Sequence, residues 1–356
     1  MPNLDSVPPP TPDPGAPVGE PRLESAWNAQ LPLDPNRDLL GRHRALQLIS
    51  IALIVAGLVL PIAAVLAYRD LLPALTSGDV GQSLVQRLLV PLLLVLLGGL
   101  ALLGGLVLNT VRALVVRAAL PLERYRGPSV IVLLLIALIV GSLAGLPAGK
   151  DALAIQFGGA LTVGGTLLIL TATQIGLLAV TGGLVVVPRT LAGLHLSPSK
   201  GLLRSMLIGL LLAIPAWIGT TLLANLVVGL LRSLGLSPTA GPVDAVLTRG
   251  DPTVLVLAVV LVAPIAEELF FRGLVFNAWE RERGTRVAVV GSAALFALIH
   301  GSLVQLLPIF VLGIGLALLY RSTRSLPATM AMHAGFNAIT VTITLLARLG
   351  VISLPT

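Results

Sequence analysis

Long apolar runs separated by short polar connections set the pattern of this chain. A helix that crosses a membrane needs about 20 mainly apolar residues, and nine segments reach or approach that length. They are residues 45–68, 88–110, 129–147, 161–187, 205–231, 253–277, 287–300, 303–320 and 326–347. Because 287–300 is short, the pattern predicts an all-α polytopic membrane helix bundle of about eight or nine transmembrane helices. The stretch 153–187 is long enough for one tilted helix or for a helix plus a re-entrant piece.

Composition agrees with a chain embedded in lipid. Hydrophobic residues make up 56% of the sequence and charged residues 11%. The net charge of +7 comes from basic residues that lie mostly between apolar spans, where they orient a protein in the bilayer, so we expect no nucleic-acid partner. Their uneven division between alternate loops favours a cytoplasmic N-terminus and nine spans. With no cysteine in the chain, any bound metal must use His, Asp or Glu.

The first 40 or so residues are of a different kind. Ten prolines lie between Pro2 and Pro35, among small and acidic residues. Such a segment cannot bury enough apolar surface to order itself, so we predict a disordered tail over 1–40. The remaining chain divides into helices of unknown role at 45–250 and a core at 253–348 that carries the candidate chemistry.

Three charged residues interrupt the apolar span 253–277: Glu267, Glu268 and Arg272. An ionised side chain at mid-membrane costs about 3 kcal/mol, so such a cluster indicates chemistry or a specific pairing. Glu268 and Arg272 are one helical turn apart and we expect them to form a structural ion pair. Glu267 lies about 100° round the helix and has no adjacent basic partner on its own span, which leaves it freer to take a proton from water.

Two of the four histidines also fall in apolar spans. His300 follows Phe296 by one turn and His333 precedes Asn337 by one turn, so each pair shares a helix face. Gly284 is a reasonable turn centre between the two spans that hold Glu268 and His300, each 16 residues from it. Two antiparallel helices then bring these groups to a similar depth. His43 and His195 lie in polar connections and are expected to be solvated.

These residue types can activate water. A carboxylate takes a proton, one imidazole orients the water, and a second imidazole with an amide donates hydrogen bonds to a developing oxyanion. The reaction would be hydrolysis of an amide bond. The set Glu267, His300 and His333 can alternatively hold a catalytic zinc ion, and intramembrane carboxylates also serve proton relays in transporters. A purely structural polar network is the remaining alternative.

The three motifs E-E-x-x-x-R, F-x-x-x-H and H-x-x-x-N occur in this order on successive apolar spans. Over about residues 253–340 the chain therefore resembles the CAAX-protease and bacteriocin-processing family of intramembrane endopeptidases. The resemblance implies a catalytic glutamate at Glu267, a water-positioning histidine at His300, an oxyanion pair at His333 and Asn337, and a supporting acid–base pair at Glu268 and Arg272. Phe296 matches the aromatic residue that precedes the first histidine.

The resemblance also implies a substrate, a location and a mechanism. We expect a membrane-associated protein or peptide substrate, prenylated in some members of the family, and a site in the plasma membrane of a bacterium. No cofactor is expected to be required, although zinc stays an alternative. Because the family includes proteins linked to bacteriocin immunity, a non-hydrolytic immunity factor or regulatory scaffold is the second functional class.

Overall fold

The computed structural model describes residues 44–69, 82–117, 120, 124–157, 160–185, 201–236 and 242–353. These residues are almost entirely helical and contain no strand. Within them, eight helices are long and apolar enough to cross a membrane, and Thr285–Leu298 is a ninth, shorter apolar helix. The predicted all-α membrane bundle is therefore confirmed. The predicted tail at 1–40, with His43 and His195, lies outside the described residues.

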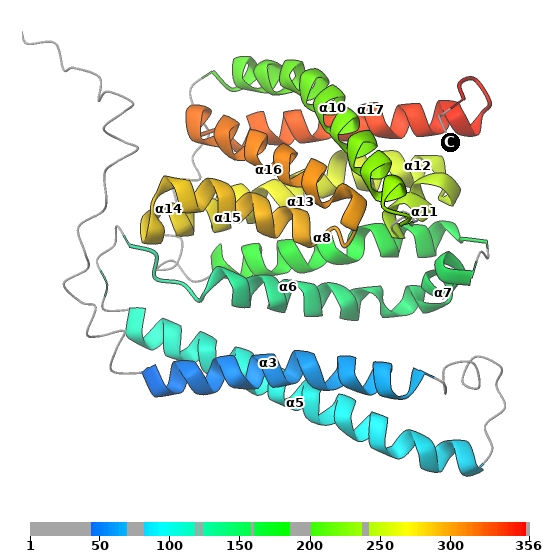
Figure 1. Cartoon of the computed structure of the whole chain (residues 1–356). Coiled ribbons are helices and arrows are strands. Elements are labelled where there is room, and N and C mark those ends of the chain that lie inside the picture. The colour runs from blue at the N-terminus through cyan, green and yellow to red at the C-terminus, as the bar shows by residue number, and fades with distance from the viewer. Residues whose placement is uncertain are drawn as a thin grey trace, which may run out of the picture.

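The first two helices form a hairpin at one edge of the bundle (Figure 1). Helix α3 (Arg44–Ala67) packs along α5 (Gln82–Arg117). Glycines allow the close approach: a Cβ on Gly57 would lie 2.5 Å from Leu102 atoms, and one on Gly105 would lie 2.8 Å from the Ile54 backbone nitrogen. Helix backbones that come this close in lipid gain van der Waals contact.

The next unit pairs α6 (Val130–Gly145) with α8 (Val163–Val185). The stretch 153–187 resolves into the end of a short helix, α7 (Gly149–Phe157), followed by α8. Asp151 of α7 accepts a hydrogen bond of 2.5 Å from the backbone N–H of Thr162. This contact satisfies a backbone donor just before α8 begins, where no helical acceptor exists.

Helix α10 (Leu202–Ser233) crosses α17 (Leu326–Arg348) diagonally (Figure 1). Gly209 permits the crossing, because a Cβ there would lie 2.1 Å from the Ala328 carbonyl oxygen. The short helix α11 (Pro242–Arg249) then leads to the segment that holds the predicted glutamates.

A continuous helix from Pro252 to Arg283 forms the centre of the bundle. It consists of α12 (Pro252–Leu255), η3 (Val256–Val262), α13 (Ala263–Glu268), η4 (Leu269–Phe276) and α14 (Asn277–Arg283). Both η segments are π-helical, with wider turns than an α-helix. The helix begins at Asp251, whose carboxylate accepts hydrogen bonds from the N–H groups of Thr253 and Val254 and so caps it. The chain turns back at Gly284, where φ is +85°.

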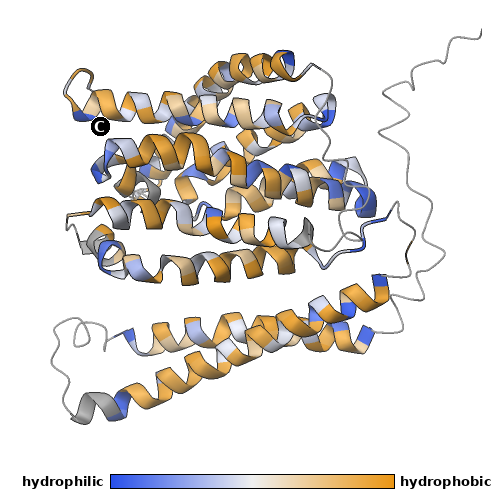
Figure 2. Ribbon diagram, turned by 180° about the vertical axis from the view of Figure 1, so that it is seen from behind, coloured by the Kyte–Doolittle hydropathy of each residue, from blue (hydrophilic) through white to orange (hydrophobic). Residues whose placement is uncertain are grey.

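After Gly284, α15 (Thr285–Leu298) and α16 (Leu303–Thr323) run antiparallel and α17 follows. With 14 residues, α15 rises only about 21 Å, less than the roughly 30 Å of a bilayer core. The turn that follows α15 therefore lies beside the middle of the central helix. The helices are largely covered with apolar residues, and hydrophilic ones gather toward many helix ends (Figure 2).

Candidate active site

Glu267 and Glu268 occupy the last turn of α13, between the two π-helical segments. Both side chains are buried, with 6% of Glu267 and none of Glu268 exposed. Single π-type turns occur often at functional sites because they change the direction of side chains and free backbone groups. Here two such segments flank the pair of carboxylates.

Glu268 forms the ion pair that its spacing predicts. The Arg272 Nη1 atom donates to the Glu268 Oε1 atom at 3.0 Å, and both side chains are fully buried. The Arg272 Nη2 atom also donates to the Gly313 carbonyl oxygen of α16 at 3.1 Å. The guanidinium lies 4.7 Å from the centre of the Phe296 ring. The Arg272 charge is thus compensated by a carboxylate, a carbonyl and an aromatic face.

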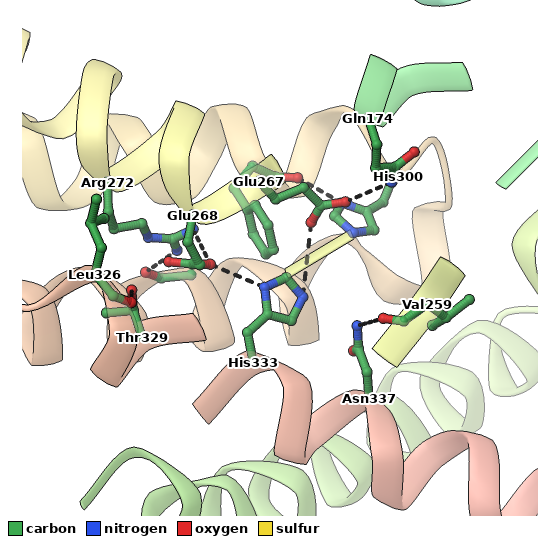
Figure 3. Close-up of polar contacts among 12 residues, drawn as sticks. Gln174, Val259, Glu267, Glu268, Arg272, His300, Leu326, Thr329, His333 and Asn337 are labelled. Carbon is green, nitrogen blue, oxygen red and sulfur yellow. Dashed lines mark hydrogen bonds and ion pairs between the residues drawn. The ribbon is translucent and has the colours of Figure 1, made fainter. Parts of the chain in front are cut away.

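His333 of α17 joins the two glutamates (Figure 3). Its Nδ1 atom lies 3.0 Å from the Glu268 Oε1 atom, and its Nε2 atom lies 3.8 Å from the Glu267 Oε2 atom. An ionised carboxylate only accepts hydrogen bonds, so Nδ1 carries a hydrogen when Glu268 is ionised. Glu268 therefore fixes the orientation of the ring and directs Nε2 toward Glu267.

One carboxylate oxygen of Glu267 accepts a hydrogen bond and the other makes none. The Gln174 Nε2 atom of α8 donates to the Glu267 Oε1 atom at 3.2 Å. The Oε2 atom is buried without a hydrogen-bond partner. Sequence reasoning missed Gln174, although it is the only Asn, Gln or charged residue in the apolar segment 161–187. Its isolation there is the signal that points to it, because a lone amide in lipid needs a partner.

Phe296 and His300 close the site from the end of α15. The ring centre of Phe296 lies 4.9 Å from that of His300 and 5.6 Å from that of His333. The His300 Nδ1 atom lies 2.7 Å from the Phe296 carbonyl oxygen. A carbonyl only accepts, so Nδ1 carries the hydrogen and Nε2 is left as an acceptor. Figure 3 shows the His300 ring beside Glu267.

Asn337 lies one turn beyond His333 and makes a different contact (Figure 3). Its Nδ2 atom donates to the Val259 carbonyl oxygen at 2.8 Å. Val259 belongs to the π-helical segment η3, so the amide binds a backbone group in one of the irregular turns. The structure thus brings Glu267, Glu268, His300 and His333 together, and attaches Asn337 to the central helix beside them.

The side chains do not form a ready metal site. Across the described residues, no three His, Asp or Glu side chains are grouped so that they could hold one metal ion. In this arrangement the set Glu267, His300 and His333 therefore does not fit a zinc ion.

The described residues form a bundle of membrane-spanning helices with buried carboxylates, and one oxygen of Glu267 makes no hydrogen bond. This arrangement defines an integral membrane protein with a buried polar site. Residues 249–339 match the family described as Rce1-like, type II CAAX prenyl endopeptidase. The match covers the whole site apart from Gln174 and confirms the resemblance seen in the motifs. That family is a family of proteases, which supports a peptidase. Searches of curated proteins and of solved structures found no match.

Proposed function

We propose that this chain is an intramembrane endopeptidase in which Glu267 activates the attacking water. The observation that supports it is the asymmetry of the Glu267 carboxylate. One oxygen is held by Gln174, whereas the other is buried, makes no hydrogen bond and faces His333. A carboxylate oxygen that is shielded from bulk solvent and not engaged by a donor is well suited to accept a proton.

In this mechanism the water oxygen forms a bond to the scissile carbonyl carbon while one water proton moves to Glu267. The acceptor atom His300 Nε2 orients the water. The carbonyl oxygen gains negative charge, and donors from His333 and Asn337 stabilise it. When the C–N bond breaks, the proton on Glu267 passes to the leaving nitrogen, so the products are a carboxylic acid and an amine.

The role of His333 requires both of its ring nitrogens to be donors, which is the imidazolium form. Nδ1 then binds Glu268, and Nε2, which faces Glu267, is available to the oxyanion. Asn337 contributes through the second N–H of its amide, since the first binds Val259.

The test uses the full chain in proteoliposomes. Matched peptides with and without a prenylated C-terminal cysteine are incubated with the wild type and with Glu267→Gln, and the products are identified by mass spectrometry. We expect cleavage by the wild type, faster for the prenylated peptide, and a loss of 10²–10⁴-fold in kcat for the variant, the usual contribution of a general base. Near-wild-type turnover by Glu267→Gln would exclude Glu267 as the base.

A cellular comparison searches for the natural substrate. Membranes from cells that carry the wild type or Glu267→Gln are compared by proteomics for peptides whose processing disappears. A biological effect that Glu267→Ala retains in full would instead favour a non-hydrolytic immunity factor or scaffold.

We further propose that the reaction requires no tightly bound zinc. The arrangement of Glu267, His300 and His333 supports this, because these side chains are not grouped so that they could hold one metal ion. Activity should survive extensive chelation. Stoichiometric zinc in the purified protein, with activity lost on its removal and restored on its return, would overturn the glutamate mechanism.

A further inference from the structure

We infer that Gln174 is a positioning residue for Glu267, supplied by a helix outside the segment that matches the protease family. This inference rests on the proposed function. Gln174 lies in α8, 93 residues before its partner, whereas the family match begins at residue 249. It gives the helices before residue 250 a role in the reaction, because one of them contributes a contact to the catalytic carboxylate.

The rotation of α8 about its axis is set by α6. A Cβ on Gly176 would lie 1.9 Å from the Ala137 carbonyl oxygen, and one on Gly141 would lie 2.6 Å from the Ala172 carbonyl oxygen. Any larger side chain at these positions would separate the two helices. Gly176 is two residues after Gln174, about 200° round the helix. The face that packs on α6 is therefore opposite the face that carries the amide.

Leu177 supports the same orientation. It lies one turn after Gln174, on the same side of α8, and is fully buried. It packs with Phe270 and Phe271 of the central helix in one hydrophobic cluster. The helix is thus fixed from both sides, by backbone contact with α6 and by apolar packing against the core, and Gln174 is directed at Glu267 without depending on its own hydrogen bond to hold α8 in place.

Electrostatics determine which way the amide points. The alternative rotamer would place the Gln174 carbonyl oxygen against an ionised carboxylate, which offers no donor. The Nε2 donor therefore faces Glu267 Oε1, and the Gln174 Oε1 atom stays buried without a hydrogen bond. Binding one carboxylate oxygen limits rotation of the group and leaves the other oxygen as the proton acceptor. Gln174 thus selects which oxygen of Glu267 acts.

The kinetic experiment replaces Gln174 with leucine, which has a similar volume but no donor. Hydrogen bonds to charged groups contribute about 1.5–3 kcal/mol, so kcat of Gln174→Leu should fall about tenfold to a hundredfold while KM stays within about twofold of the wild-type value. The matched control is Thr171→Val on the same helix, whose hydroxyl binds only the Leu167 carbonyl of its own helix at 2.7 Å. Its kcat should not change. A wild-type kcat for Gln174→Leu, with Glu267→Gln inactive, would overturn the inference and leave the proposed function standing.

A second measurement needs no substrate, so it separates failure of the inference from failure of the proposed function. The apparent Tm is measured for Gln174→Leu, Glu267→Leu and the double variant. If the two side chains interact as described, the shift of the double variant is smaller than the sum of the single shifts, because the second substitution removes a partner that is already lost. Additive shifts would show that Gln174 does not hold Glu267 and would overturn the inference, whatever the chain hydrolyses.

Discussion

The N-terminal hairpin and the candidate active site both bury polar groups between apolar helices, yet the two regions differ in how completely these groups are hydrogen-bonded. In the hairpin, Asn109 Nδ2 donates to Ser50 Oγ at 3.0 Å, and Ser50 Oγ donates to the Gln47 carbonyl at 2.8 Å. Arg112 Nη2 donates to Gln47 Oε1 at 2.9 Å. These contacts connect α3 to α5 and hold the two helices in register.

The site keeps buried atoms that make no hydrogen bond. They are Glu267 Oε2, Glu268 Oε2, Gln174 Oε1 and Arg272 Nε, whereas the described part of the hairpin has one such atom, Thr110 Oγ1. A buried polar atom without a partner costs about 1–3 kcal/mol, and such atoms are rare in folded proteins. A structural network removes this cost by pairing its members, whereas an active site keeps acceptors and donors for its substrate. The difference supports a structural interpretation of the hairpin network and a chemical one of the Glu267 cluster.

The hairpin helices are also less buried than the central helix. In the most apolar window of each hairpin helix 17% of residues are buried inside the protein, against 56% in the central helix Pro252–Arg283. The neutral amide and hydroxyl groups of the hairpin tolerate a thin protein shell because they satisfy one another, and its charged member Arg112 lies within two turns of the end of α5. Charged groups need to be surrounded by protein or water rather than by lipid. The central helix provides such a shell for Glu267, Glu268 and Arg272.

The largest expected effect is a loss of stability on replacing Arg272 in the site, compared with replacing Arg112 in the hairpin. Arg272→Ala removes the partner of a fully buried carboxylate and should lower the free energy of unfolding by about 3–5 kcal/mol, with activity falling as well. Arg112→Ala in the hairpin removes a hydrogen bond from a charged donor to the Gln47 amide and should cost about 1.5–3 kcal/mol. Thermal or denaturant unfolding in detergent measures both.

The contrary outcome is equally informative. If Arg272→Ala melts like the wild type and loses only activity, Arg272 acts in the reaction rather than as a structural partner of Glu268. In that case the buried ion pair would not be a structural contact, and the distinction between the hydrogen-bonded hairpin network and the catalytic cluster would not hold for Arg272.

Asn337 should produce the next largest effect. Loss of one oxyanion donor typically lowers kcat 10²–10³-fold, so we expect a loss of about this size for Asn337→Ala, with little change in KM. The control is Thr344→Val on α17, whose hydroxyl binds the Thr340 carbonyl of its own helix at 2.9 Å. A large drop in Tm with kcat retained would instead show that the contact to Val259 is the main role of Asn337.

Substitution of Asn277 tests whether its amide stabilises the π-helical segment η4. Its Nδ2 atom lies 2.9 Å from the carbonyl oxygens of both Arg272 and Gly273, in the π-helical segment η4, and 2.8 Å from Tyr320 Oη. Asn277→Leu leaves buried carbonyls without this donor and should cost about 1–3 kcal/mol of stability. Tyr320→Phe removes only the hydroxyl and should cost less. Equal Tm values for both variants would show that the π-helical turn does not depend on the amide.

Much of this arrangement follows from local patterns in the sequence. The nine apolar segments correspond to helices that begin and end within a few residues of the prediction, apart from longer ends of α5 and of the central helix. Gly284 ends a helix with φ of +85°, as its place between charged residues predicts. Glu268 and Arg272 pair because residues one turn apart on a helix share a face. Period, turn chemistry and spacing are local properties, so one sequence is sufficient to identify them.

The rest depends on tertiary packing that no local pattern encodes. Gln174 reaches Glu267 only because glycines set the rotation of α8 against α6. The apolar pattern predicted a helix over 253–277 but did not predict that residues 256–262 and 269–276 are π-helical. The contacts of Asn337 and Asn277 with carbonyl groups of these segments therefore could not be predicted either. Spacing placed Asn337 on the same face as His333, but it did not reveal the carbonyl to which its amide donates.

The smallest expected effect concerns the hairpin. Asn109→Leu removes one donor, while Ser50 keeps its bond to the Gln47 carbonyl, so no other group is stranded. Interhelical hydrogen bonds in membranes contribute about 0.6–2 kcal/mol, and stability should fall by about that amount, with kcat and KM unchanged because the hairpin holds none of the reacting groups. Paired measurements of Tm and of peptide hydrolysis decide the outcome. A tenfold loss of kcat at an unchanged Tm would place the hairpin in the reaction and would remove the distinction between the two polar networks.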